Sequence, residues 1–284
     1  MSAAGAVTVV VPVWDRYCAF LPECVDALLD QVEGPPSIVV VDNASSVRLP
    51  TLPPTVTVVR SDVRLSVGSA RNLGLARVTT EHVVFCDADD TLLPDAIAFL
   101  RARLARRRAL VGVVCRYVSW NPETGARAML EGSPRAVAVR VARFRRLFAL
   151  VNLRYNCFPI VGGAFRTAAV RDAGGFGDAN VGEDWILGTQ LAFRGPLELH
   201  RRSTFVRRVH RGSLWYRNHD PADYLARCDL LRARISRDPS VPRWVRSLMP
   251  LLRRVHRRDV ARATAGLEAV APNNPLLEPR GAAE

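Results

Sequence analysis

Short apolar runs rich in β-branched residues recur through the first hundred residues, and polar residues follow most of them. Consecutive apolar positions of this kind are typical of strands that are covered on both faces of a parallel sheet. The segments between the runs have the apolar face of an amphipathic helix. The pattern predicts strands at 7–13, 37–41, 56–60 and 82–86 and helices at 19–31, 68–77 and 94–107. This order predicts an α/β domain with a mainly parallel sheet.

The second half of the chain is less regular. We expect strands at 110–120, 134–141, 159–165 and 197–209, and helices at 143–151, 167–174, 182–193, 222–236 and 243–267. The tail beyond residue 272 is proline-rich, and we expect it to be frayed.

Polar residues follow the strands at three places in the first half. They are Trp14-Asp15, Asp42-Asn43 and the segment Asp87-Ala88-Asp89-Asp90. In a parallel sheet, the ligand crevice lies outside the carboxyl ends of the strands. These residues are therefore candidates for a binding site.

The segment Asp87-Ala88-Asp89-Asp90 is the sharpest candidate for chemistry. Three carboxylates in four residues repel one another unless a cation or a donor neutralises them. Oxygen ligands in an irregular turn suit Mg²⁺ or Mn²⁺, and these ions also coordinate oxygens of a substrate phosphate. The alternative is a solvated turn in which Asp90 caps the following helix.

Three further positions have both a functional and an ordinary interpretation. Glu183-Asp184 begins a helix, where acids favour the helix dipole but can also act as a general base. Arg71 lies in the first turn of a helix, where phosphate binds readily, although an exposed arginine is the commoner case. His210 follows a strand and is a metal candidate or a surface residue.

Charge changes the picture more than composition does. Of the 284 residues, 49% are hydrophobic and 24% are charged, which is normal for a globular protein. The net charge of +13 is unevenly distributed: residues 1–100 have 6 arginines against 12 acids, and residues 101–284 have 34 against 15. All 40 basic side chains are arginine. A basic half indicates three possible kinds of partner: nucleic acid, an anionic membrane or a phosphorylated small molecule.

Several enzyme classes are disfavoured by what the sequence lacks. The first strand is followed by no GxGxxG, and no GxxxxGK[ST] or GxSxG is present. The absence of lysine excludes a P-loop lysine. The six cysteines form no CxxC pair, so we expect reduced thiols and no structural zinc. With no signal peptide or apolar stretch of about 20 residues, we expect a cytoplasmic protein.

Taken in order, the motifs resemble those of the GT-A glycosyltransferases of family 2. The segments that carry this resemblance are VTVVVPVWDR, SIVVVDNASS, VGSARNLGLA, HVVFCDADDTLLP, VGGAFRTAAVRDAGGFGDANVGEDWILGTQLAFRG and VRRVHRGSLWYR. They span about residues 7–217. The resemblance implies a GT-A fold and the transfer of a sugar from a nucleoside diphosphate donor to an acceptor hydroxyl, with inversion at the anomeric carbon. It implies a catalytic domain over 1–217, in which 1–109 binds the donor and 110–217 binds the acceptor. Residues 218–284 are then expected to form a helical extension.

The resemblance also implies roles in donor binding. Pro12, Val13 and Asp15 resemble the strand end that contacts the nucleotide. Asp42 resembles the acid that recognises the nucleobase, and Arg71 resembles the arginine beside the nucleotide and its diphosphate.

The same resemblance implies which residues bind the metal and which residue is the general base. Asp87 and Asp89 match the Asp-x-Asp motif that holds a divalent metal, Mg²⁺ or Mn²⁺, with Asp89 the more direct ligand and Asp87 nearer the ribose or metal. His210 resembles a late histidine that some members place on the metal. Asp184 matches the general base, and Glu183 supports it or touches the acceptor.

Two departures from the family pattern bear on function. Trp14-Asp15 stands where many members have Tyr-Asn, so the contact to base or ribose is expected to differ. The Gln-x-x-Arg-Trp block of processive synthases does not follow Asp184, so we expect the addition of a single sugar rather than processive synthesis. The donor base, the sugar and the acceptor stay open, and a natural product or a glycan is compatible with the sequence.

The alternative is a basic binding module without catalysis, acting on a membrane or on nucleic acid. Its motivation is the arginine-rich segments at 101–108 and 243–262. The second segment can form an apolar stripe flanked by arginine, as on an interfacial helix, from Trp244, Val245, Leu248, Leu251, Leu252 and Val255. The ordinary interpretation is that this stripe packs on the domain. We expect no nucleic acid partner, and we keep the inner face of the membrane or self-association as candidate contacts of these helices.

Overall fold

The structure, a computed structural model, describes residues 6–129, 145–154, 156–157, 159–180, 182–210 and 221–266. The expected strand at 134–141 and the tail beyond 272 lie outside these residues. Within them, nine strands form one sheet in the order β3-β2-β1-β4-β8-β6-β9-β5, and β7 pairs with β6. The strands are β1 (Val7–Val13), β2 (Ser37–Asn43), β3 (Val56–Ser61), β4 (His82–Phe85), β5 (Thr91–Leu92), β6 (Gly112–Trp120), β7 (Arg127–Met129), β8 (Ala164–Arg166) and β9 (Leu197–Arg208).

The first half of the sheet has the predicted parallel arrangement. Strands β3, β2, β1 and β4 are all parallel, so their carboxyl ends meet at one edge. The second half is mixed: β8 runs antiparallel to both β4 and β6, whereas β6 and β9 are parallel. The result is an α/β fold in which a parallel half is continued by a mixed half.

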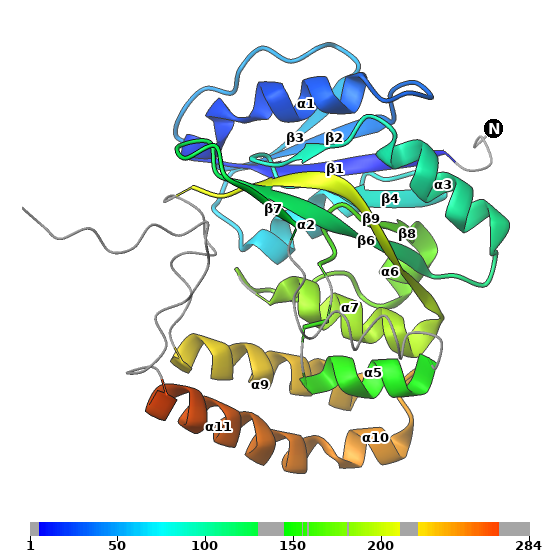
Figure 1. Cartoon of the computed structure of the whole chain (residues 1–284), viewed down its shortest axis with the longest axis vertical. Coiled ribbons are helices and arrows are strands. Elements are labelled where there is room, and N and C mark those ends of the chain that lie inside the picture. The colour runs from blue at the N-terminus through cyan, green and yellow to red at the C-terminus, as the bar shows by residue number, and fades with distance from the viewer. Residues whose placement is uncertain are drawn as a thin grey trace, which may run out of the picture.

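Helices cover both faces of the sheet (Figure 1). One face carries α1 (Leu21–Leu29), α3 (Ala96–Arg106) and the short 3-10 helix η1 (Asp15–Ala19). The other face carries α2 (Val67–Leu75), α6 (Thr167–Asp172) and α7 (Glu183–Arg194). Beyond α7 lie α5 (Arg145–Arg154) and α9 (Pro221–Arg237), and α10 (Arg243–Ser247) and α11 (Met249–Gly266) lie farthest from the sheet.

The alternation of side chains along β1 explains why its run is apolar at nearly every position. Val9 and Val11 point into the core beneath α1 and α3, whereas Val10 points into the core beneath α2 and α7. All seven residues of β1 are buried. A strand covered on both faces has no position that favours a charged side chain, which is the pattern that the sequence presents.

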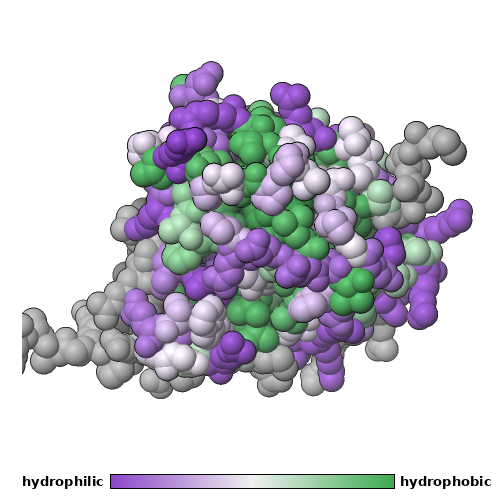
Figure 2. All heavy atoms as spheres, turned by 90° about the horizontal axis from the view of Figure 1, so that it is seen from above, coloured by the Kyte–Doolittle hydropathy of each residue, from purple (hydrophilic) through white to green (hydrophobic). Residues whose placement is uncertain are grey.

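The α1 face of the molecule is seen from above in Figure 2. Hydrophobic patches there are interspersed with hydrophilic side chains, as is usual for a protein surface. None of the described helices combines the length and the apolar character needed to cross a bilayer. All six cysteines are buried free thiols.

Two of the expected elements differ in the structure. The strand expected at 159–165 is a turn that leads into the short β8, because Gly162 adopts a left-handed φ of +72°. The helix expected at 243–267 is divided at Leu248 into α10 and α11. Pro250 stands at the second residue of α11, and a proline has no N–H for the hydrogen bond that a continuous helix would need there.

The helices of the expected extension share a core with the sheet. Leu231 on α9 and Val245 on α10 belong to the same buried cluster as Phe85 of β4 and Phe165 of β8. The division of the chain at residue 217 stays a prediction.

Candidate active site

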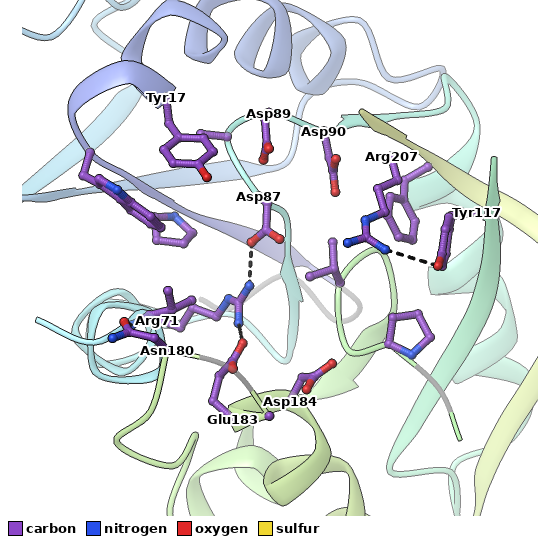
Figure 3. A pocket seen from close by; sticks show the side chains of 18 of the residues that line it. Tyr17, Arg71, Asp87, Asp89, Asp90, Tyr117, Asn180, Glu183, Asp184 and Arg207 are labelled. Carbon is purple, nitrogen blue, oxygen red and sulfur yellow. Dashed lines mark hydrogen bonds and ion pairs between the residues drawn. The ribbon is translucent and has the colours of Figure 1, made fainter. Parts of the chain in front are cut away.

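A cavity of about 310 Å³ opens at the carboxyl ends of β1 and β4, facing the first turn of α7 (Figure 3). Its walls come from segments far apart in the sequence. The described residues that line it include Pro12, Trp14, Tyr17, Arg71, Asp87, Asp89, Asp90, Tyr117, Asn156, Asn180, Glu183, Asp184 and Arg207. Six of these have roles that the family resemblance implies: Pro12, Arg71, Asp87, Asp89, Glu183 and Asp184. Trp14 and Asp90 belong to the strand-end segments that were expected to line a binding site.

The aspartates after β4 have different environments. Asp87 and Asp89 are partly exposed to the cavity, whereas Asp90 is buried. Asp90 Oδ1 accepts a hydrogen bond of 3.0 Å from the backbone N–H of Arg208 on β9. Burial, with a further contribution from Asp89 and Asp87, raises the pKa of Asp90 well above its usual range. The alternative interpretation, in which Asp90 caps the next helix, does not hold, because Asp95 is the residue before α3.

Arg71 connects the aspartate loop to the start of α7. Its side chain is only 3% exposed, and its guanidinium lies 2.5 Å from a carboxylate oxygen of Asp87 and 2.5 Å from one of Glu183. Burial disfavours the charge of Arg71, but Asp87 and Glu183 outweigh it and raise its pKa. The guanidinium of Arg71 therefore stays positively charged in the wall of the cavity, where it is paired with two acids (Figure 3).

The first turn of α7 places its two acids differently. Gly182, before the helix, has a φ of +82°, a conformation that favours glycine and lets the chain turn into the helix. Glu183 is buried against Arg71, and Asp184 is partly exposed and faces the cavity. The Nδ2 of Asn156 lies 3.3 Å from both carboxylate oxygens of Asp184.

Burial shifts the proton affinity of both acids on α7. It raises the pKa of Glu183 to about 7, and Arg71 acts in the opposite direction. It also raises the pKa of Asp184, against which Arg71 and the hydrogen bond from Asn156 act. A carboxylate with a raised pKa is a stronger base, so Asp184 has the properties of a proton acceptor.

His210 reaches the aspartate loop from the end of β9. Its Nε2 lies 3.0 Å from Oδ2 of Asp89, and its ring packs beside Tyr17 and Phe20. Among the described residues, no three His, Cys, Asp or Glu side chains gather as a ready metal site. Asp89 and His210 offer an oxygen and a nitrogen, which suit a divalent cation that takes its remaining ligands from a substrate and water.

The residues expected to contact the nucleotide lie at the ends of β1 and β2. Pro12 lines the cavity, but Val13, Asp15 and Asp42 are not among the described lining residues. Asp15 accepts hydrogen bonds from the N–H and hydroxyl of Ser46, which lower its pKa.

Asp42 is engaged within the protein. It is 3% exposed, forms an ion pair with Arg60 and accepts a hydrogen bond of 3.0 Å from the N–H of Ser45. Its role in base recognition stays a prediction.

Five lining residues with polar side chains were not expected: Tyr17, Tyr117, Asn156, Asn180 and Arg207. Arg207 on β9 donates to the hydroxyl of Tyr117 on β6 over 3.4 Å, and both lie across the cavity from Arg71 (Figure 3). The parallel pairing of β6 with β9 brings them together. The sequence offers one signal for Arg207, its position in the VRRVH segment three residues before His210.

The family model Glycosyl transferase family 2 matches residues 8–169, more than half of the chain. No curated protein sequence matches the chain significantly.

Similar solved structures have the same fold. Residues 1–349 of TarS from S. aureus, in complex with UDP-GlcNAc, superpose with a TM-score of 0.66 at 14% identity, over 94% of this chain and 76% of that one. The mannosyltransferase PcManGT from Pyrobaculum calidifontis, in complex with GDP-Man and Mn²⁺, gives a TM-score of 0.56 at 21% identity, with the same coverage. The chain belongs to glycosyl transferase family 2 and is a glycosyltransferase with the GT-A fold.

Proposed function

We propose that this enzyme transfers a single sugar from a nucleoside diphosphate donor to an acceptor hydroxyl, with inversion and with the help of a divalent metal. The observation that carries the proposal is that one cavity contains Asp89, Arg71 and Asp184. An acid for a metal, a cation for a diphosphate and a base for a hydroxyl are the three groups that such a transfer needs.

The donor is proposed to bind along the carboxyl ends of β1 and β2. Pro12, Val13, Asp15 and Asp42 are the proposed nucleotide contacts there. Two similar structures hold UDP-GlcNAc and GDP-Man, which supports a nucleotide sugar as donor. For Asp42 to contact the nucleobase of the donor, its carboxylate would have to share or exchange its ion pair with Arg60.

Asp89 and His210 are the proposed protein ligands of the metal, and Asp87 lies beside them. Mg²⁺ and Mn²⁺ both fit an oxygen and nitrogen donor set completed by phosphate oxygens. The Mn²⁺ in the mannosyltransferase complex supports this class of ion. When bound, the cation would neutralise charge that develops on the departing nucleoside diphosphate.

Arg71 is proposed to stabilise the same leaving group from the other side. Its raised pKa keeps it charged throughout the cycle. Because Asp87 and Glu183 hold the guanidinium on two sides, it needs little reorganisation when the diphosphate departs, which is the condition for effective electrostatic stabilisation.

Asp184 is proposed as the general base. It would accept the proton of the acceptor hydroxyl while that oxygen attacks the anomeric carbon on the face opposite the leaving group. Inversion requires only this one base, and no protein nucleophile. Glu183 is proposed as a positioning residue, because its contact with Arg71 fixes the first turn of α7.

The acceptor is proposed to enter on the side of the cavity formed by β6 and β9. Tyr117 and Arg207 offer polar groups there, and Pro159 and Val161 add apolar surface. This wall fits a molecule with a polar or anionic group close to the reacting hydroxyl.

A screen of UDP, GDP and dTDP sugars for hydrolysis or transfer, with Mg²⁺ or Mn²⁺, tests the proposal directly. The active donor is then given to the Asp89→Ala and Asp184→Asn variants, and Asp26→Asn, on the exposed face of α1, serves as the matched control. We expect both site variants to lose turnover by a factor of about 10² or more and the control to keep it. Near-wild-type turnover in both site variants would exclude the proposed roles.

A further inference from the structure

The outer helices α10 and α11 carry a surface that the transfer reaction does not use. On their outer face, Trp244 is 54% exposed, Leu248 40% and Leu251 56%. Trp244 lies on α10, Leu248 at the junction and Leu251 on α11, and their spacings of four and three residues favour one apolar side of the two helices. The three residues are named here the outer stripe.

The outer stripe is distinct from the residues with which the same helices pack on the protein. Val245, Met249 and His256 point inward, with exposures of 1%, 5% and 0%. Of the stripe expected from the sequence, Val245 is buried and Leu252 packs against the core, and these form its inward part, whereas the outer stripe is its outward part. The fold already satisfies the inward part, which leaves the outward part in need of a different explanation.

Arginines surround the outer stripe almost without counter-charge. Residues 243–262 include seven arginines and one acid, Asp259. Arg154 on α5 binds that acid through two hydrogen bonds of 3.2 and 2.9 Å. Four exposed arginines of α11 make no ion pair with any described residue: Arg253, Arg254, Arg257 and Arg258. The outer face is therefore strongly positive.

An open hollow between α9 and α11 adds to this positive surface. Five arginines line it, and its one acid, Asp229, is paired with Arg232. Four of the five come from the segment that carries the outer stripe: Arg246, Arg253, Arg254 and Arg257. Arginine presents several donors in a planar fork and matches the oxygens of a phosphate. The hollow therefore has the chemistry of a phosphate-binding surface.

We propose that α10 and α11 dock on an anionic lipid surface, with the outer stripe in the interface and the arginines on the lipid phosphates. An apolar face with tryptophan and leucine beside a basic face is what binds a helix in the plane of a membrane. Figure 1 shows these helices on the side of the molecule farthest from the sheet, where no other described element covers them.

A second copy of the chain fits this surface less well. A two-fold contact would bring the same arginines of both copies face to face, and like charges repel there. The cores of protein interfaces are depleted in charged residues. A nucleic acid would use the arginines but not the outer stripe. An anionic bilayer accommodates both at once, and the proposal does not depend on donor or acceptor.

Sedimentation of the full chain with lipid vesicles tests the proposal without any substrate. Vesicles made of equal parts phosphatidylcholine and phosphatidylglycerol are compared with vesicles of phosphatidylcholine alone. We expect binding to the anionic vesicles only, and weaker binding as salt rises, because salt screens charge on exposed arginines. Equal binding to both vesicles, or to neither, would overturn the proposal.

Two variants separate the contributions of charge and apolar surface. The pair Arg254→Gln and Arg258→Gln should weaken binding about 25-fold at low salt, since each arginine near an anionic surface contributes about fivefold. Replacing all three outer-stripe residues with serine should abolish the binding that persists at high salt. The matched controls combine exposed residues elsewhere: Arg77→Gln with Arg106→Gln, and Val32→Ser with Val47→Ser and Val63→Ser.

The controls should bind like the parent chain, and all variants should keep its melting temperature because every substituted side chain is exposed. If the charge controls weaken binding as much as the α11 pair, the effect is one of net charge and the proposed surface is wrong. A dimer in solution that the serine substitutions dissociate would assign the surface to a second copy and would likewise overturn the proposal.

Discussion

His256 on α11 packs edge-on against Trp185 on α7, with ring centroids 5.9 Å apart. Trp185 directly follows Asp184, the proposed base, and its indole N–H donates to the backbone oxygen of Asn152 on α5 over 2.5 Å. Tyr224 on α9 stacks on the same indole at 6.1 Å. Side chains or backbone of α5, α9 and α11 therefore contact the residue that follows the proposed base on α7.

This packing gives the enzyme a stability that depends on pH. Burial, with a second contribution from Arg232, lowers the pKa of His256 to about 4, whereas histidine in an unfolded chain titrates near 6.5. Between these values the unfolded chain binds the proton and the folded protein does not. The free energy of unfolding should therefore fall as pH falls from about 6.5 to 4, by up to about 1.4 kcal/mol per pH unit from this group.

Urea unfolding of the parent chain and His256→Gln at several pH values measures this contribution. Glutamine can still accept the hydrogen bond that Arg232 donates to the ring, but it does not titrate. The variant should lose stability less steeply than the parent below pH 6.5, and His200→Gln should not. Parallel curves for parent and His256→Gln would show that the ring is protonated in the folded protein.

The Arg71 ion pairs should contribute to stability as a coupled unit. Arg71→Met leaves Glu183 buried without its partner, and removing one partner of a buried pair costs about 3–5 kcal/mol. In the double variant with Glu183→Gln, the unpaired charge disappears as well. We expect the double variant to be less destabilised than the sum of the two single variants.

A double-mutant cycle measured by urea unfolding gives this coupling energy. A value above about 1 kcal/mol is expected for residues in direct contact. Arg166 and Glu81 form a matched control pair nearer the surface, with a distance of 2.7 Å, and exposed pairs contribute about 0–1 kcal/mol. If the losses of unfolding free energy at Arg71 and Glu183 are additive, the two residues do not stabilise the protein as a coupled pair.

The pH dependence of transfer should report on the contact between Asn156 and Asp184. The base must be ionised, so the rate should fall as pH falls through the pKa of Asp184, which burial raises. The amide of Asn156 favours the ionised form. Asn156→Ala should therefore raise this pKa and move the acid limb of the rate profile to higher pH.

Profiles of kcat against pH for the parent, Asn156→Ala and Asn180→Ala check this expectation. Asn180 lines the same cavity but accepts its hydrogen bond from the N–H of Val67, so its removal should leave the acid limb in place. An unchanged limb in Asn156→Ala would mean that a different group sets the pH dependence.

The sequence was a good guide wherever a structural choice is local. The run at 7–13 predicted β1 with its observed bounds, because a strand buried on both faces must be apolar at every position. The acids Asp87 and Asp184 were found because strand ends and helix starts are readable from local patterns. Both line the cavity.

Contacts between distant segments were not predictable in the same way. Nothing near Arg71 in the sequence indicates that its guanidinium joins Asp87 to Glu183, which is 112 positions away. Arg207 and Tyr117 come together only through the pairing of β6 with β9, and one arginine among 40 gives no signal by itself. The contact of Asp90 was not predictable for the same reason, since its partner is the backbone of β9.

Removal of His210 should separate metal binding from nucleotide binding. His210 contacts Asp89 through its Nε2 at 3.0 Å, and we expect His210→Ala to weaken Mn²⁺-dependent donor binding by at least about tenfold. Donor binding without metal should change little, because the nucleotide contacts proposed on β1 and β2 remain. Titration of the nucleotide with and without Mn²⁺ measures the metal-dependent and the metal-independent affinity, with His200→Ala as the control. If His210→Ala weakens binding equally in both conditions, the histidine contacts the nucleotide or supports the fold rather than holding the metal.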